Sequence, residues 1–243
     1  FVIGEDYEYA RSMASSFWNS LLHWNPRSVK VGEAWPKLMT EDYSVYLKQI
    51  IDARPTAVFA AFGGSGRVTF IKQAQKAGLF ESTRVFMTLL ADSSMPGLLK
   101  ESMPAKNAFG SAQYLYYFPR TAANDAFLAS YTAFAKSNGV PTPNSPSYAV
   151  FGGYCAAKFM VEALNKAGNT YSDLVVAALE GLTIDTPVGP ITMRPCDHQA
   201  MAPVIWGALG KVEGFSAPVL FQPLIVRAED VAASCEEVLK RRK

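Results

Sequence analysis

A glycine-rich loop, Phe62-Gly63-Gly64-Ser65-Gly66-Arg67, is the first motif in the sequence that could carry chemistry. A dinucleotide fingerprint counted from Gly64 would need a third glycine at position 69, where threonine stands. A nucleophile elbow around Ser65 would need glycine at position 67, where arginine stands. The third interpretation needs only small residues with free amides at the carboxyl end of a strand, where α/β folds bind ligands. We favour it, with Phe62, Gly63 and Gly64 as candidate ligand-binding residues.

Histidine and metal-binding patterns are sparse. The chain has two histidines, His23 and His198, and neither accompanies a nucleophile motif of known spacing. No group of His, Cys or carboxylate residues shows metal-ligand spacing. We therefore expect no catalytic residue, no metal and no cofactor, and we predict that the protein is not an enzyme.

Tyrosines give a more positive signal. Tyr9 and Tyr114 lie near the ends of expected strands or on a crossing segment. Burial in the core is one interpretation, and an apolar wall of a small-molecule cleft is the other. Both remain open, and both tyrosines are candidate ligand-binding residues.

The three cysteines are too few for a disulfide scaffold. Cys155 lies in an apolar stretch and is expected to be a buried small side chain. Cys196 and Cys235 have polar neighbours, and an oxidising compartment would permit a bridge between them. The sequence leaves open whether that bridge forms.

Composition indicates an ordinary globular protein. Of the 243 residues, 49% are hydrophobic and 18% charged, and the net charge is +2. That charge gives no broad field for nucleic acid, so nucleic acid is not an expected partner. Apolar runs fall short of the roughly 18 residues that span a membrane.

The first ninety residues alternate apolar strands with amphipathic helices, which predicts a parallel sheet with helices on both faces. Expected strands cover residues 1–4, 29–33, 57–62 and 84–90. Beyond residue 90 an extended segment, 107–118, precedes three helices at 122–137, 148–167 and 171–180. Two strands at 190–194 and 202–209 form an expected hairpin, and a strand at 219–226 and a helix at 230–239 follow.

Several motifs together resemble the leucine/isoleucine/valine-type periplasmic solute-binding proteins of ABC transporters. The resemblance covers nearly the whole chain and rests on seven short stretches. They are Gly4-Glu5-Asp6-Tyr7-Glu8-Tyr9-Ala10, Val31-Gly32-Glu33, Thr40-Glu41-Asp42-Tyr43-Ser44, Phe70-Ile71-Lys72-Gln73-Ala74, Gly78-Leu79, Gly189-Pro190-Ile191-Thr192-Met193 and Asp197-His198-Gln199.

The resemblance implies a two-lobed α/β fold of the type I periplasmic-binding class, with parallel sheets flanked by helices. Residues 1–113 would form the second lobe, and 114–187 the helical portion of the first lobe with its hinge crossings. Residues 188–243 would return to the second lobe as a hairpin, a strand and a helix. The first lobe's sheet would then lie upstream, so the first lobe is incomplete in this chain.

The resemblance also assigns site residues. Tyr9 resembles the tyrosine at the mouth of the second lobe's first helix, and Phe62, Gly63 and Gly64 resemble strand-end positions that touch the ligand. Leu90 falls where amino-acid binders of the family carry an acid that pairs with the ligand ammonium. The nearest acid here is Asp92. We therefore favour a carboxylate or neutral ligand, aromatic or aliphatic, over a branched-chain amino acid.

The implied function is capture of a small organic solute and its delivery to an ABC permease, by a monomer. The protein would be periplasmic, or lipid-anchored outside the cell, and made as a precursor with a signal peptide. The alternative is a ligand-sensing domain of a regulator or receptor, which a fused signalling helix or effector would distinguish.

Overall fold

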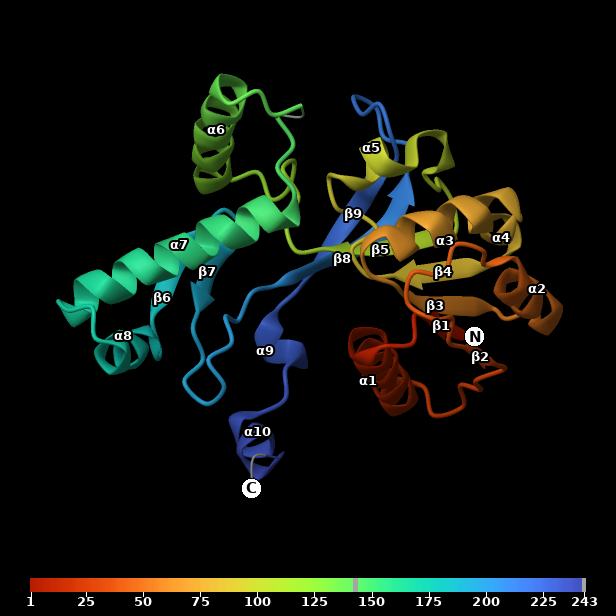
Figure 1. Ribbon diagram of the computed structural model, residues 1–243, viewed down its shortest axis with the longest axis horizontal. Helices are drawn as coiled ribbons and strands as arrows, with labels where there is room; N and C mark the ends of the chain where they lie inside the picture. The colour runs from red at the N-terminus through yellow and green to blue at the C-terminus, as the bar shows by residue number, and fades with distance from the viewer. Residues whose placement is uncertain (142–143, 242–243) are drawn as a thin grey trace. The chain divides into compact units, whose positions relative to one another are not determined.

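The computed structural model describes residues 1–141 and 144–241 and divides into two units (Figure 1). Unit 1 consists of Phe1–Ala91, Met95–Ser111 and Trp206–Pro223. Unit 2 consists of Asp92–Ser94, Ala112–Ile205 and Leu224–Lys243.

Unit 1 is built on a seven-stranded sheet with the order β2-β1-β3-β4-β5-β8-β9. The first five of these strands pair in parallel. In chain order the strands are β1 (Val2–Gly4), β2 (Glu33–Ala34), β3 (Ala57–Ala61), β4 (Arg84–Met87), β5 (Ala108–Ala112), β8 (Val204–Gly210) and β9 (Val219–Val226). The helices of this unit are α1 (Glu8–Trp24), α2 (Ser44–Ala53), α3 (Gly64–Lys76), α4 (Leu79–Ser82), α5 (Met95–Leu99) and the short 3-10 helix η1 (Lys100–Ser102).

Strand β3 shows why helices cover both faces of this sheet. Alternate side chains of a strand point to opposite faces. Phe59 and Ala61 pack with Ala10 and Ala14 of α1, whereas Phe62, just beyond the strand, stacks on Phe70 of α3. Figure 1 shows α1 and α3 on opposite faces of the sheet. The near-continuous apolar run of this strand is thus buried on both faces, as expected for a parallel sheet.

Unit 2 is mainly helical. Its elements are α6 (Ala122–Ser137), α7 (Tyr148–Ala167), α8 (Ser172–Leu179), β6 (Thr183–Thr186), β7 (Gly189–Thr192), α9 (Ala228–Val231) and α10 (Cys235–Arg241). Aromatic side chains dominate its core, where Tyr114 stacks on Phe151 and meets Phe127 edge to face.

The first strand of the expected hairpin pairs with a different strand from the one predicted. Strand β7 pairs antiparallel with β6, and not with β8, to form a separate two-stranded sheet. Ile184 and Ile191 face each other across this pair and are both buried in the unit 2 core, which explains the choice. Residues 183–186, within the expected helical portion 114–187, therefore form a strand.

Other predicted elements also differ from the structure. The strand expected at 29–33 shrinks to Glu33–Ala34, and the side chains of Val29 and Val31 are exposed. The helix expected at 230–239 is interrupted by an extended residue, Ala232, which separates α9 from α10.

Near the C-terminus the chain contributes to both units, and the predicted lobe bounds stay a prediction. Only Trp206–Pro223 joins unit 1, whereas the β6–β7 pair and both C-terminal helices lie in unit 2. The guanidinium of Arg194 donates to the backbone oxygen of Ala233 at 2.7 Å and holds the C-terminal segment to the β7 region.

Candidate functional site

The candidate site lies at the carboxyl edge of the unit 1 sheet. The chain runs outward from β1 in opposite directions, to β2 on one side and to β3 on the other. Open parallel sheets bind ligands outside the carboxyl ends of the strands at such a switch point. The residues that leave β1 and β3 here are Gly4–Tyr9 and Phe62–Gly66.

Tyr9 and Thr88 bring two elements together at this edge. Tyr9 is in the first turn of α1, and Thr88 directly follows β4. Their hydroxyl oxygens lie 3.2 Å apart and share a hydrogen bond. Tyr9 keeps 36% of its surface exposed, whereas Thr88 is only 5% exposed, so Tyr9 is the member of the pair that a small molecule can reach.

Tyr7 and Glu5 line the same edge more deeply. The ring of Tyr7 stacks on that of Tyr9 with centroids 5.8 Å apart. Burial raises the pKa of the Tyr7 phenol, and the neighbouring Glu5 carboxylate raises it further. Glu5 is only 2% exposed and accepts hydrogen bonds from the backbone amides of Met39 at 3.1 Å and Gly63 at 3.5 Å.

The glycine loop has a structural explanation in these contacts. A Cβ on Gly66 would lie 2.3 Å from a carboxylate oxygen of Glu5, and one on Gly63 would lie 2.4 Å from the Tyr7 hydroxyl. Gly64 has a φ of +43°, a conformation that favours glycine. The glycines thus make room for side chains of the protein itself at the start of α3.

Phe62 and Leu90 are at the expected edge but point into the core. Both are fully buried. Phe62 lies between Phe70 and Tyr43, with ring centroids 4.5 Å and 5.5 Å away. Leu90 packs so closely on β5 that a Cβ on Gly110 would lie 2.9 Å from it.

Asp92 and Tyr114 belong to unit 2, and their side chains have partners within that unit. The Asp92 carboxylate is 1% exposed and accepts from the Tyr148 amide, the first residue of α7, and from the amide and hydroxyl of Ser94. The Tyr114 hydroxyl donates to Asn124 at 2.7 Å, and burial raises the pKa of this phenol. A ligand-binding role for either residue stays a prediction.

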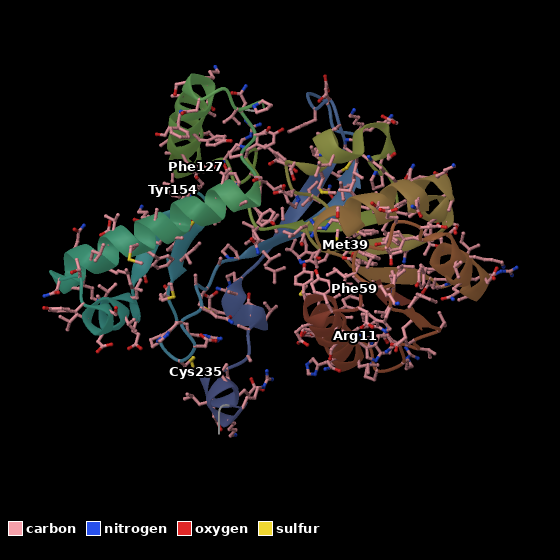
Figure 2. All side chains as sticks on the ribbon, viewed as in Figure 1. Arg11, Met39, Phe59, Phe127, Tyr154 and Cys235 are labelled. Carbon is pink, nitrogen blue, oxygen red and sulfur yellow. A yellow bond between two sulfur atoms is a disulfide. The ribbon has the colours of Figure 1, made fainter. Side chains whose placement is uncertain are left out.

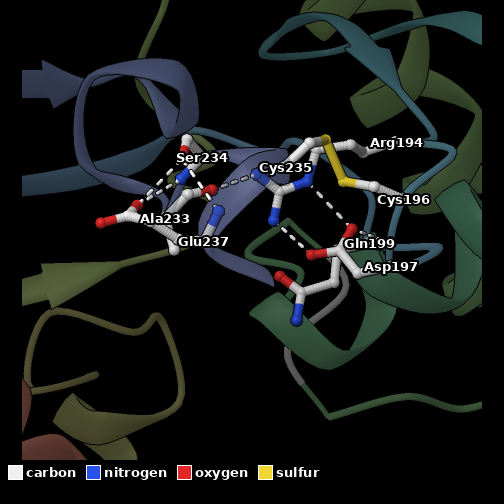
Figure 3. The surroundings of a disulfide bond; sticks show 8 residues. All are labelled: Arg194, Cys196, Asp197, Gln199, Ala233, Ser234, Cys235 and Glu237. Atoms are coloured by element: carbon white, nitrogen blue, oxygen red, sulfur yellow. Dashed lines mark hydrogen bonds and ion pairs between the residues drawn. A yellow bond between two sulfur atoms is a disulfide. The ribbon is translucent and has the colours of Figure 1, made fainter. Parts of the chain in front are cut away.

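Cys196 and Cys235 form a disulfide bond in unit 2 (Figure 3). The bridge joins the loop after β7 to the start of α10, across 39 residues of sequence. Arg194 lies beside the disulfide, where its guanidinium donates two hydrogen bonds to the Asp197 carboxylate and one to the backbone oxygen of Ala233. Cys155 is a buried free thiol, and burial raises its pKa to about 11.

The two histidines lie in different units. His23 is near the end of α1, about 20 Å along the helix axis from Tyr9. His198 lies in unit 2 and pairs with Glu180 at 2.9 Å. Within residues 1–141 and 144–241, no group of three or more His, Cys, Asp or Glu side chains is placed to hold a metal ion.

The sequence matches the model of one protein family, described as periplasmic binding protein, over residues 1–211. The chain belongs to the periplasmic binding protein family. A comparison with curated proteins found no match. None of the helices in the described part of this periplasmic binding protein is long and apolar enough to cross a membrane.

Solved structures share its fold. A Brucella ovis protein that binds leucine, isoleucine, valine, threonine and alanine is 18% identical, with a TM-score of 0.78 over 96% of this chain and 59% of that chain. A Rhodopseudomonas palustris HaA2 solute-binding protein in complex with p-hydroxybenzoic acid is 16% identical, with a TM-score of 0.77 over 93% and 60%.

A third structure is a solute-binding protein of Rhodopseudomonas palustris BisB5 in complex with 3,4-dihydroxybenzoic acid. It is 23% identical, with a TM-score of 0.75 over 93% of this chain and 60% of that chain. The two Rhodopseudomonas palustris structures are solute-binding proteins of ABC transporters, and all three structures share the type I periplasmic-binding fold of the present chain. The present chain spans about 60% of the length of such relatives and therefore represents part of that fold.

The site residues expected from the sequence include Tyr9, Gly63 and Gly64 but not Glu5 or Thr88. Position relative to the strands could have indicated both, because Glu5 follows β1 and Thr88 follows β4. Their contacts depend on strand order, which periodicity alone does not determine.

Proposed function

We propose that this periplasmic binding protein holds a small organic solute against the carboxyl edge of the unit 1 sheet and delivers it to an ABC importer. The supporting observation is the Tyr9–Thr88 hydroxyl pair at the switch point of the sheet. An exposed aromatic face and two hydroxyls there suit a ligand with an apolar body and a polar substituent.

The proposed solute is a carboxylate or a neutral compound with an aromatic or aliphatic body. Leu90 replaces the acid that would pair with a ligand ammonium, and the carboxylates of Glu5 and Asp92 are buried and accept protein hydrogen bonds. A buried ammonium without a counter-charge would cost several kcal/mol. The benzoic-acid derivatives in two of the similar structures are consistent with this class.

We place the protein in the periplasm, or outside the cell with a lipid anchor, and as a monomer. The disulfide supports an oxidising compartment, because cytosolic thiols are kept reduced. Binding involves no chemical step, and closure around the solute supplies the binding energy.

Native mass spectrometry of the complete gene product, purified without denaturation, tests this proposal. We expect a bound organic acid or neutral compound, and isothermal titration with that compound should give saturable binding. Turnover of the bound compound would contradict the proposal. So would an amino acid whose binding depends on Asp92, shown by its loss in Asp92→Asn.

A further inference from the structure

Glu5 is a buried acid that joins parts of unit 1 that are distant in sequence. Its carboxylate accepts from the amide of Met39, 34 residues away, and faces the amide of Gly63, 58 residues away. It is 2% exposed, and Gly66 leaves the space that it occupies. One side chain therefore connects the end of β1, residues 36–40 (the Met39 loop) and the start of α3.

This arrangement also has an electrostatic consequence. The start of a helix favours a negative charge because its first amides point outward without backbone partners. In α3 the protein's own carboxylate lies against this first turn. An acidic group of the solute would meet repulsion from Glu5 here, so this edge is suited to the uncharged end of a solute.

Met39 is the unusual residue in the loop that Glu5 holds. Its φ is +63°, a conformation that L-residues adopt at an energetic cost and that glycine adopts freely. Its side chain is 75% exposed (Figure 2). Local stability would be better served by glycine at this position, so the methionine side chain needs another explanation. An adaptable apolar side chain is suited to contacting a ligand.

We propose that Glu5 is a positioning residue for solute binding: its carboxylate holds the Met39 loop at the start of α3, and Met39 contacts the apolar body of the solute. This proposal rests on the proposed function. Its two parts, the anchoring by Glu5 and the contact by Met39, are tested by separate measurements on the full-length protein.

Amide hydrogen exchange measured by NMR tests the anchoring without any ligand. Glu5→Ala should speed exchange of the Met39 amide about tenfold, the effect of one lost hydrogen bond. Glu5→Gln, which keeps one acceptor oxygen, should have a smaller effect and guards against misfolding of the alanine variant. Asp6→Asn is the matched control, since Asp6 is a neighbouring exposed acid paired with Arg11. Wild-type exchange at Met39 in both Glu5 variants would overturn the anchoring.

Isothermal titration with benzoate, 4-hydroxybenzoate and L-leucine as probes tests the contact. Met39→Gly should weaken the best probe at least about fivefold, the range for a lost apolar contact, while Tm stays equal or rises. Arg54→Gly is the matched control: Arg54 also has positive φ, +44°, but ends α2, and its replacement should leave affinity unchanged.

The outcomes separate the two proposals. Unchanged affinity in Met39→Gly overturns the contact, and so does an equal loss in Arg54→Gly. If no probe binds the wild-type protein, the proposed solute class fails and the Met39 contact fails with it. The exchange measurement decides on Glu5 in either case.

Discussion

The hydroxyl of Tyr9 lies 3.2 Å from that of Thr88, although 79 residues separate them in sequence. The pair joins the first turn of α1 to the turn after β4 at the carboxyl edge of the sheet. Since each hydroxyl can donate and accept, the pair can rearrange to present either function to a solute.

Removing this pair should weaken solute binding more than it weakens the fold. For the compound found by native mass spectrometry, Tyr9→Phe and Thr88→Val should each lower affinity about 2- to 12-fold, the effect of one net hydrogen bond. The measurement is isothermal titration, and Tyr171→Phe, which alters an exposed tyrosine of unit 2, is the control. Unchanged affinity in both variants would exclude the pair from the site.

Truncating Phe62 should act on stability first. Its ring is fully buried between Phe70 and Tyr43, so Phe62→Ala should cost about 3–5 kcal/mol of unfolding free energy. Urea denaturation measures this loss. A variant with wild-type stability but impaired binding would instead place the ring in contact with the solute.

We predict that substitutions at Glu5 and Gly66 have coupled effects on the free energy of unfolding. Gly66→Ala should destabilise the protein by about 1–3 kcal/mol through overpacking, because the new Cβ would lie 2.3 Å from a Glu5 oxygen. Glu5→Ala in the same chain should recover part of that loss, and a double-mutant cycle measures the coupling. Additive effects would show that the two residues do not interact.

Gly64→Ala serves as the comparison for that cycle. Its Cβ would meet no atom within 4 Å, and its φ is +43°, so its cost of about 1–2 kcal/mol should come from the backbone alone. Glu5→Ala should not relieve it.

The disulfide should stabilise the attachment of the C-terminal segment. A chain closed over 39 residues gains about 3–4 kcal/mol in the loop-entropy model. The residues of α9 and α10 bury no side chains, so Cys235→Ser should make this segment susceptible to protease. Limited proteolysis followed by mass spectrometry provides the measurement, with Cys155→Ala as a control that leaves the bridge intact.

The buried thiol of Cys155 gives a pH prediction. Burial raises its pKa from 9.0 to about 11, so the folded protein holds this proton more strongly than the unfolded chain. Its contribution to stability is therefore complete below about pH 9 and decreases as pH rises toward 11. Urea denaturation across this range should show a steeper loss in the wild type than in Cys155→Ala. Fast thiol labelling of the native protein at pH 7 would contradict its burial.

The local pattern of apolar residues was sufficient to predict the strand–helix alternation of unit 1 and most of the helices. Apolar periodicity marked both ends of α6 and α7, because their buried faces require it. The same pattern predicted the strand-end positions of Tyr9, Gly63 and Gly64. The broken glycine motifs argued against a nucleotide site, but the pattern could not reveal that Gly66 makes room for Glu5.

Only the tertiary structure decided which strands pair and which cysteines are bonded. Strand β7 pairs with β6 because both bury an isoleucine in the same core, and the sequence offered β8 as an equally apolar neighbour. The cysteine pairing was open for the same reason, since spacing does not reveal whether two loops meet. Phe62 and Tyr114 are of residue types that are common in binding sites, yet packing buries both side chains. Side-chain periodicity is a property of a short segment, whereas pairing, burial and hydrogen bonding depend on residues that only the folded chain brings together.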